Sequence, residues 1–320
     1  MKPPYSITPT ILRKLVSISE KMGEVKTAYL LQPTTELRKQ NRIKTIQSSL
    51  GIEGNTLTIE QITALVNNKR VLAPEKDILE VKNAISAYQQ IDTYRPYSVT
   101  SICKAHKLLM SGLVETAGKI RMQYVGIIKG SHVSHLAPPA HLAKTHLQNL
   151  LEYVKNDSDP LLVKSCVFHY EFEFIHPFMD GNGRMGRLWQ TVLLRKEYPV
   201  FDFLPMESLI KKRQADYYNS LEISDKTGDS TAFIEFMLCV IDDSLEELLS
   251  SQPVHPTADS RIAIFKTVIK TNAFSRKEYM RHFKDISTAT ASRDLKKAAE
   301  QGALIKSGDG RMTLYKYRDV

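Results

Sequence analysis

A glycine-rich stretch, residues 176–187, holds side chains whose types and spacing suit the transfer of a phosphate group. His176 carries an imidazole that can take up a proton near neutral pH. Asp180 offers a hard oxygen ligand for Mg²⁺. Arg184 and Arg187 stand three residues apart, so on a helix they share one face, and guanidinium groups suit phosphate oxygens. Together these residues provide a base, a metal ligand and two cationic clamps.

The glycines of this stretch predict a tight loop followed by a helix. Gly181 and Gly183 let the backbone turn sharply and approach a ligand closely. A helix is expected to start near Arg184, so that its first N–H groups and its dipole point at a bound phosphate. No Gly-x-x-x-x-Gly-Lys-Ser/Thr loop occurs, which excludes an ordinary P-loop. The nucleotide contacts are expected at Gly181, Asn182, Gly183, Arg184, Met185, Gly186 and Arg187.

The stretch resembles the motif of the Fic family, His-Pro-Phe-x-Asp-Gly-Asn-Gly-Arg-x-x-Arg, and matches it at every fixed position. The resemblance implies a protein adenylyltransferase that uses ATP with Mg²⁺. In that reading His176 deprotonates a target hydroxyl, which attacks the α-phosphate in line, and pyrophosphate leaves. Asp180 would hold Mg²⁺, and Asn182 with the neighbouring N–H groups would cradle the α-phosphate. Arg184 would contact the β-phosphate and Arg187 the γ-phosphate.

Two further segments extend the resemblance to roughly residues 100–240. Gly118-x-x-Arg121 and the following residues resemble the flap hairpin of the family, which docks the target segment by strand addition. The docking contacts would lie on the flap at Val125, Ile127 and Ile128. The Tyr217-Tyr218 pair resembles the segment near the adenine, and Tyr218 is the expected contact. Packing in the core remains an equally good interpretation of these tyrosines.

An upstream segment resembles the inhibitory motif of Fic proteins, Ser/Thr-x-x-x-Glu-Gly/Asn, with Ser49 and Glu53 at its fixed positions. This implies the class with an N-terminal inhibitory helix. A carboxylate from Glu53 on Arg187 would remove the cation that clamps the γ-phosphate and add negative charge where a triphosphate must fit. The alternative is a solvated carboxylate at a helix end. Gly51 weakens the helix by about 1 kcal/mol relative to alanine, which favours a looser brake.

The elements around these residues are predicted to be mainly helical. Apolar residues recur at three- and four-residue spacing in 162–174 and 188–193. The best strand is 123–128, and the turn-like residues 129–132 after it indicate a hairpin. A helix is expected to begin near Leu142. The predicted fold is therefore mainly α, a Fic-type helical bundle with a small β-hairpin flap.

The clearest domain boundary in the sequence follows a helical run at 233–249, where two prolines lie among small polar residues. We expect a linker at 251–257. The regions on either side are an N-terminal helical region with the inhibitory motif, 1–100, a Fic core, 101–250, and a C-terminal unit, 258–320.

The C-terminal unit is predicted to be a winged helix-turn-helix domain. Three short helices are expected, at 261–270, after Ser275, and from Ser287 to about Glu300, followed by strands at 303–306 and 312–315. Residues 253–320 hold 14 Lys+Arg and 7 Asp+Glu, so much of the net charge of +9 lies here. DNA binding and protein binding both stay open. The DNA contacts would be Thr288, Thr290, Ser292, Arg293, Lys296 and Lys297, with Arg311 in the wing.

The composition is that of an ordinary globular protein, with 42% hydrophobic and 25% charged residues. No apolar run reaches the roughly 18 residues of a membrane span, and no signal core follows the start, so we expect a cytoplasmic protein without membrane contact. The three scattered cysteines, Cys103, Cys166 and Cys239, are expected to be small buried residues without disulfides. A homodimer remains open.

The function predicted from the sequence is an autoinhibited protein adenylyltransferase that transfers AMP from ATP to a Ser, Thr or Tyr hydroxyl of a protein, including itself. Two alternatives remain. One is a Fic enzyme with other chemistry: transfer of a phosphate or another nucleotide, or removal of AMP. The other is a DNA-binding regulator in which the Fic core senses nucleotide.

Overall fold

The computed structural model describes residues 2–27, 35–129, 132–250, 257–270, 272–308 and 310–318. The chain divides into two compact units, 1–250 and 251–320, and each is described by itself. The proposed regions 1–100 and 101–250 lie in the same unit. Most of the expected linker, residues 251–256, lies outside the described residues.

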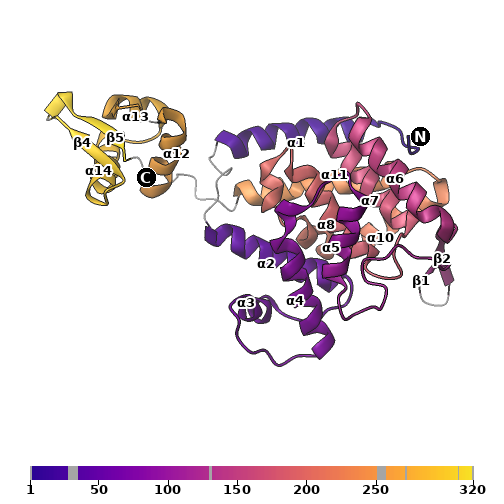
Figure 1. Cartoon of the computed structure of the whole chain (residues 1–320). Helices are drawn as coiled ribbons and strands as arrows, with labels where there is room; N and C mark the ends of the chain where they lie inside the picture. Colours follow the sequence, from indigo (N-terminus) through magenta and orange to yellow (C-terminus); the bar gives the residue numbers. More distant parts are fainter. Residues whose placement is uncertain are drawn as a thin grey trace. The chain divides into compact units, whose positions relative to one another are not determined.

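The first unit is a helical bundle with one small hairpin, as the sequence predicted (Figure 1). Its helices are α1 Pro9–Thr27, α2 Thr35–Ile52, α3 Ile59–Val66, α4 Glu75–Gln89, α5 Val99–Leu109, α6 Ala140–Asn156, α7 Leu161–Ile175, α8 Asn182–Arg195, α9 Met206–Lys212, α10 Gln214–Thr227 and α11 Thr231–Ser250. Two 3₁₀ turns, η1 Ile91–Thr93 and η2 Pro199–Asp202, connect helices.

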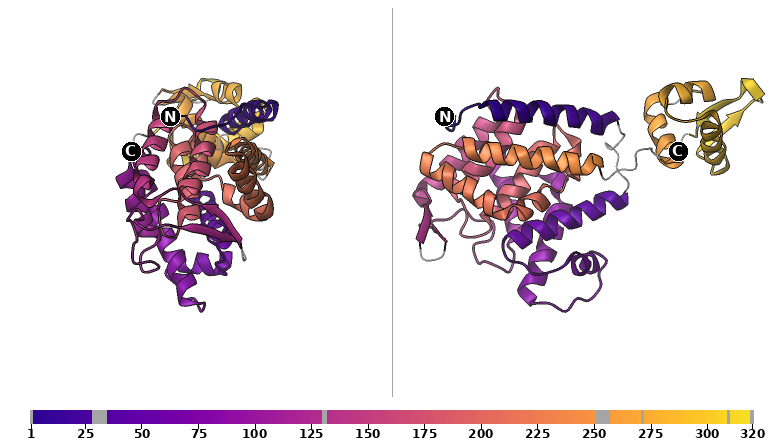
Figure 2. Two further views of the ribbon diagram at one scale, coloured as in Figure 1. Left: turned by 90° about the vertical axis from the view of Figure 1, so that its right-hand side faces the viewer. Right: turned by 180° about the vertical axis from the view of Figure 1, so that it is seen from behind.

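Helices α7 and α8 pack against each other in the middle of this unit. Both are buried along most of their length, and Phe168, Phe172, Leu188 and Trp189 have no exposed surface. A helix that is buried along most of its length needs neighbours on all sides. Helix α11 contacts α7, α1 lies along α11, and α6 contacts α7 (Figure 2). The loop between α7 and α8 is therefore held between two rigid elements.

The hairpin pairs β1, Gly126–Lys129, with β2, His132–Leu136, in antiparallel register, with an irregularity between Ile127 and Ile128. The first strand begins three residues later than predicted from the sequence. The turn residues Gly130 and Ser131 lie outside the described residues. Helix α6 starts at Ala140, two residues before the expected position, directly after a pair of prolines that suits a helix start.

The second unit comprises α12 Ala258–Ile269, β3 Phe274–Ser275, α13 Arg276–His282, α14 Thr288–Glu300, β4 Leu304–Ser307, η3 Gly310–Met312 and β5 Leu314–Tyr317. Ser275 and Ser287 cap helices as predicted, the first through a capping box with Glu278. The sheet has three strands in the order β3-β5-β4, so the predicted two-stranded hairpin was incomplete. Strand β5 begins later than expected because η3 occupies the residues before it.

The cysteines differ in burial. Cys166 is buried, as expected, whereas Cys103 and Cys239 are only half-buried, and all three are free thiols. The latter two were predicted to be buried from their apolar neighbours in sequence, and that prediction was wrong in degree, because apolar neighbours along the chain do not fix which side of a helix faces the core. Among the helices that the structure describes, none has the length and apolar character needed to cross a membrane.

Candidate active site

The glycine-rich loop joins α7 to α8 through two residues in left-handed conformations. His176 ends α7 with a φ of 48°, and Gly181 precedes α8 with a φ of 81°. A side chain in this conformation is unfavourable, so His176 must be held there by its surroundings. The Nδ1 atom of His176 lies 3.2 Å from the carbonyl oxygen of Glu173. Because a carbonyl only accepts, Nδ1 carries the proton, and in the neutral ring Nε2 has the lone pair that a base needs.

Arg121 holds the backbone on either side of His176. Its buried guanidinium donates to the carbonyl oxygens of His176 at 2.7 Å and Ile175 at 3.2 Å. It also donates to Gln123 at 2.9 Å and Pro138 at 2.6 Å, the residues that flank the hairpin. One cation thus ties the base of the flap to the start of the loop and satisfies carbonyls that the end of α7 leaves open.

A buried histidine supports the other end of the loop. His106 of α5 stacks on Phe178 with ring centroids 3.7 Å apart. The N–H of Gly118 donates to its Nδ1 at 2.8 Å, so its Nε2 carries the proton and donates to the carbonyl of Asp180 at 2.9 Å. Burial lowers the pKa of His106 to about 4. The ring is therefore a neutral support.

Asn182 closes the loop with its side chain. Its Oδ1 accepts from the N–H of Phe178 at 3.0 Å, and its Nδ2 donates to the carbonyl of the same residue at 2.9 Å. The predicted phosphate contact of Asn182 would then come from its backbone N–H. Helix α8 begins at Asn182, two residues before the expected start, so the N–H groups of 182–184 have no acceptor within the helix.

Three other predicted contacts lie in this helix start. The N–H of Met185 already donates to the carbonyl of Gly181, and its side chain is in the core. At Gly186 a Cβ atom would lie 2.9 Å from the ring of His169, so this glycine allows α8 to approach α7. At Gly183 a Cβ atom would lie 2.6 Å from Oε1 of Glu53. The space at the helix start thus holds a carboxylate where an anion would bind.

Arg187 is buried, with only 2% of its surface exposed, and it is paired with the upstream segment that holds Ser49 and Glu53. Its NH2 donates to Oε1 of Glu53 at 2.7 Å and to the carbonyl of Ser49 at 3.0 Å. Its Nε donates to the hydroxyl of Ser49 at 3.1 Å. Burial is the largest single effect and lowers the pKa of Arg187, but Glu53, Tyr217 and Glu173 together outweigh burial and raise that pKa. The structure brings together the residues of the two sequence motifs, which lie 134 residues apart.

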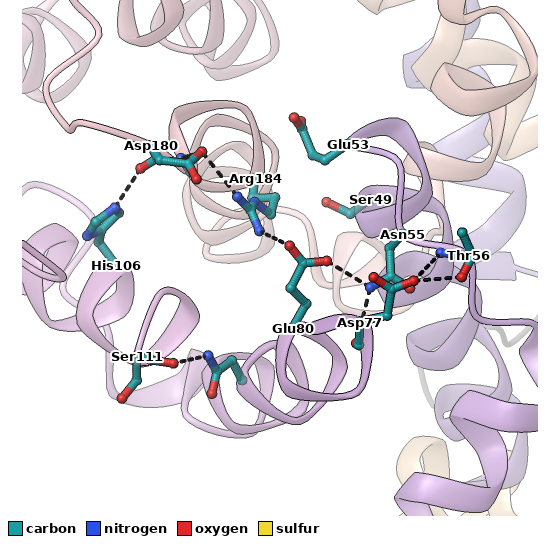
Figure 3. A network of polar contacts seen from close by, with 12 residues as sticks. Ser49, Glu53, Asn55, Thr56, Asp77, Glu80, His106, Ser111, Asp180 and Arg184 are labelled. Atoms are coloured by element: carbon teal, nitrogen blue, oxygen red, sulfur yellow. Dashed lines mark hydrogen bonds and ion pairs between the residues drawn. The ribbon is translucent and has the colours of Figure 1, made fainter. Parts of the chain in front are cut away.

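The segment with Glu53 is fixed on both sides of that residue. Gln214 of α10 donates to the carbonyl of Ile52 at 3.0 Å. The Nδ2 of Asn55 donates to the carbonyl of Asp77 at 3.1 Å, and Thr56 binds the Asp77 carboxylate through its N–H and its hydroxyl (Figure 3). Gly51 lies within α2, and a Cβ atom there would overlap the side chain of Lys211. This glycine therefore also makes room for a neighbour.

Arg184, 6% exposed, contacts two different carboxylates (Figure 3). Its NH1 donates to Oε1 of Glu80 at 3.2 Å, and its NH2 to Oδ1 of Asp180 at 3.3 Å. The side chain of Asp180 is 58% exposed, whereas Glu80 of α4 is buried. The sequence did not single out Glu80, because an acidic residue on a helix normally faces solvent.

A second buried acid faces Arg187. The Oε1 atom of Glu173 is buried and has no hydrogen-bond partner among the described residues. Burial raises its pKa to about 8; Arg187 works against this rise and Glu53 adds to it. Oε1 of Glu173 and Oε1 of Glu53 both lie close to the position of a Cβ at Gly183. This end of the site is thus crowded with acidic groups.

The tyrosines and the flap lie farther from the loop. Tyr217 is buried, and its hydroxyl lies 3.1 Å from Nε2 of His169. Tyr218 is half-buried beside Tyr217, with ring centroids 5.3 Å apart. Val125 is half-buried next to β1. Ile127 and Ile128 lie in β1, whose second edge is unpaired among the described residues, although their side chains lie outside the description.

The DNA contacts predicted for the C-terminal unit lie on α14, except for Arg311, whose side chain is outside the described residues. Arg293, Lys296 and Lys297 are exposed. Two of them pair within the unit: Lys297 with Asp259 at 2.9 Å and Lys296 with Glu300 at 3.8 Å. The binding of DNA stays a prediction.

The chain is similar to a Fic family protein from Desulfovibrio desulfuricans G20 whose crystal structure is known. The two are 39% identical, the TM-score is 0.76, and the match covers 99% of this chain and 98% of the other. The Fic/DOC family matches residues 96–194. The chain belongs to the Fic/DOC family. Its glycine-rich loop and α8 are therefore the Fic motif in its structural setting.

Other Fic proteins match over less of their length. The chain is 28% identical over 226 residues to a protein named Protein adenylyltransferase fic-1 from Caenorhabditis briggsae, covering 65% of this chain and 42% of that one. The relative of the same name from Caenorhabditis elegans is 26% identical, with 72% and 47% covered. The chain spans about half the length of the curated relatives it matches. The solved structure of Fic-1 (aa134–508) from C. elegans is 19% identical with a TM-score of 0.61 over 75% of this chain and 72% of that one, and it shows the shared fold.

The Fic motif fits a Mg²⁺ that arrives with a nucleotide. Among the described residues no group of three His, Cys, Asp or Glu side chains could hold a metal ion by itself. Mg²⁺ is usually bound by one or two carboxylates together with substrate phosphates. The exposed carboxylate of Asp180 at the mouth of the loop meets that requirement.

Proposed function

We propose that this Fic protein is an autoinhibited protein adenylyltransferase, which transfers AMP from ATP to a hydroxyl of a protein, including itself, and releases pyrophosphate. The observation that carries the proposal is the ion pair between Glu53 and Arg187, the last fixed residue of a complete Fic motif. The names of the relatives support the reaction class.

In this proposal His176 acts as the general base. Its Nδ1–H is held by the carbonyl of Glu173, so Nε2 takes the proton of the target hydroxyl. The oxygen attacks the α-phosphate, and pyrophosphate departs on the opposite side. The N–H groups of 182–184 hold phosphate oxygens at the positive end of α8. These contacts align the reacting atoms and stabilise the charge that develops.

The charges around the phosphates come from three side chains. Asp180 would hold Mg²⁺, and the ion would supply positive charge that neutralises the phosphates. Arg184 contacts the β-phosphate and Arg187 the γ-phosphate.

Tyr218 lies beside the adenine, and the open edge of β1 pairs with the target segment through Val125, Ile127 and Ile128.

In the inhibited state Glu53 occupies the place of the γ-phosphate. It satisfies Arg187 and brings a negative charge against the space at Gly183, so a triphosphate meets repulsion and lacks its clamp. Ser49 holds the same guanidinium in place by accepting from it twice. Removing the carboxylate should therefore open the site.

The test is self-labelling of the purified protein with Mg²⁺ and ATP labelled on the α-phosphate. Glu53→Gly should increase incorporation roughly 5- to 150-fold, the range of a coupling of 1–3 kcal/mol. In that background His176→Ala should lower the rate roughly 10²- to 10⁴-fold with little change in melting temperature. The mass of the adduct distinguishes AMP from phosphate or another nucleotide.

Glu36→Gly is the matched control, because Glu36 is an exposed glutamate in the first turn of α2, at the end of that helix away from Glu53. It should leave labelling as in the parent. An absence of label from both the parent and Glu53→Gly would contradict AMP transfer. Equal labelling of the two would contradict the inhibition while leaving the chemistry in place.

A further inference from the structure

The carboxylate of Glu80 lies behind the guanidinium of Arg184 and comes from an element outside both sequence motifs. Its Oε1 accepts from NH1 of Arg184 at 3.2 Å (Figure 3). Glu80 belongs to α4 and is 104 residues from Arg184 along the chain. It is only 7% exposed. A buried carboxylate is tolerated when it is paired and hydrogen-bonded, and here a cation of the active site supplies the pairing.

The second oxygen of Glu80 is also occupied, so the carboxylate has a fixed orientation. Its Oε2 accepts from Nδ2 of Asn55 at 2.8 Å. The Oδ1 of Asn55 accepts from the N–H of Leu57 at 3.1 Å, which assigns the direction of the amide. Helix α4 packs against α2 and α5. Glu80 is thus part of a packed and hydrogen-bonded framework.

The two carboxylates on Arg184 differ in the freedom they have to leave. Asp180 lies on the loop with 58% of its side chain exposed, and it contacts NH2 of the guanidinium. In the proposed reaction this exposed carboxylate would hold Mg²⁺ when the ion is bound, and NH2 would be available to a phosphate. Glu80 remains on NH1. One side of the guanidinium is then anchored and the other faces the nucleotide.

We propose that Glu80 is a positioning residue that holds Arg184 in place for the β-phosphate of a nucleoside di- or triphosphate. The proposal rests on the proposed function in one respect, that Arg184 meets the second phosphate. An arginine side chain has many rotamers, and a fixed partner on one side reduces those that must be lost on binding. A carboxylate also weakens the attraction of the guanidinium for phosphate. The two effects predict opposite changes in nucleotide affinity when Glu80 is lost: the first predicts weaker binding and the second predicts tighter binding.

The test measures binding of ATP, ADP and AMP by calorimetry in the full chain carrying Glu53→Gly. Glu80→Gln should weaken ATP and ADP about tenfold, as expected when one charge-assisted contact is misplaced. AMP has no β-phosphate, so its affinity should be unchanged. The double variant with Arg184→Ala should bind ATP no more weakly than Arg184→Ala alone, because Glu80 acts only through that arginine. Glu75→Gln, an exposed glutamate in the first turn of α4, is the matched control.

Three results would overturn the proposal. Tighter binding of ATP by Glu80→Gln would make Glu80 a second inhibitory carboxylate. An equal loss for ATP and AMP would show a general structural role. Additive losses in the double variant would show that Glu80 acts independently of Arg184.

A second variant covers a failure of Glu80→Gln to fold. Asn55→Ala keeps the Glu80–Arg184 pair and frees Oε2 of Glu80, and it also removes the bonds of Asn55 to the carbonyl of Asp77 and to the N–H of Leu57. The comparison of ATP with AMP separates these effects, because only ATP depends on Arg184 in the proposal. Asn55→Ala should weaken ATP and ADP by a smaller factor, again without an effect on AMP, and an unchanged ATP affinity would count against the proposal. These measurements need no transfer of AMP. If Glu53→Gly binds ATP but modifies nothing, the proposed function fails while the binding test still decides the role of Glu80.

Discussion

Arg184 and Arg187 lie one helical turn apart on α8, and both are buried, yet their surroundings differ. Arg187 is paired with Glu53, which lies just past the end of α2 and keeps 32% of its side chain exposed. Arg184 is paired with Glu80, which is buried on α4. A buried cation needs a compensating charge in both cases. Of Glu53 and Glu80, only Glu53, at the end of an element, can leave by turning into solvent.

In the two roles that we propose, one physical requirement produces both an inhibitory contact and a support. The carboxylate of Glu53 lies against the helix start where a phosphate is expected, so a nucleotide competes with it directly. The carboxylate of Glu80 accepts from Asn55 through Oε2 and binds only NH1 of Arg184. The NH2 group of Arg184 points to the loop, where it contacts Asp180. Arg187 thus has a partner that a nucleotide can replace, whereas Arg184 has one that stays in place.

The largest expected contrast is in stability. Arg184→Ala leaves Glu80 buried without its cation and should lower the free energy of unfolding by about 3–5 kcal/mol. Arg187→Ala leaves Glu53 able to turn into water, so its cost should be smaller, about 1–3 kcal/mol. Urea denaturation of both variants measures the difference. A greater loss for Arg187→Ala would contradict the distinction between a permanent and a replaceable partner.

The next contrast concerns pH, because an acid with a raised pKa lies beside Arg187. The folded chain keeps the proton of Glu173 up to about pH 8, whereas the unfolded chain loses it near 4.5. This contribution to stability is complete below pH 4.5 and is lost as the pH rises toward 8. The slope for this one group is at most about 1.4 kcal/mol per pH unit.

Glu173→Gln should remove that slope, as measured by urea denaturation at a series of pH values. Glu53→Gly should shift its upper limit to lower pH, because Glu53 contributes to the raised pKa of Glu173. Glu20→Gln, at an exposed position of α1, serves as the control and should keep the slope of the parent. An identical slope in Glu173→Gln would exclude Glu173 as its source.

The smallest expected effect is that of Ser49. Ser49→Ala removes the hydroxyl that accepts from Nε of Arg187 but keeps the backbone carbonyl and Glu53. A hydrogen bond to a charged group contributes about 1.5–3 kcal/mol, and the lower value applies here because two other acceptors of Arg187 remain. Self-labelling should therefore rise about tenfold or less, below the rise in Glu53→Gly. A fall in labelling would mean that Ser49 supports the active form of Arg187 more than the inhibited one.

Much of the fold followed from local patterns in the sequence. The helical bundle, the hairpin, and the helix caps at Ser275 and Ser287 were predicted because each depends on neighbouring residues. Errors occurred where the signal is nonlocal. The short strand β3 was missed because it consists of two residues that are extended through pairing with β5.

The sequence by itself determined which residues form the motif: the base, the loop glycines, the two arginines, and, through the second motif, Glu53 as the candidate partner of Arg187. Tertiary structure alone decided the contacts of Glu80, His106 and the guanidinium of Arg121 with the loop and α8. The reason is physical. A side chain in a short motif is constrained by its neighbours along the chain, whereas the charge or tautomer of a buried group is set by partners that only packing brings close. No local pattern distinguishes Glu80 from a solvated glutamate.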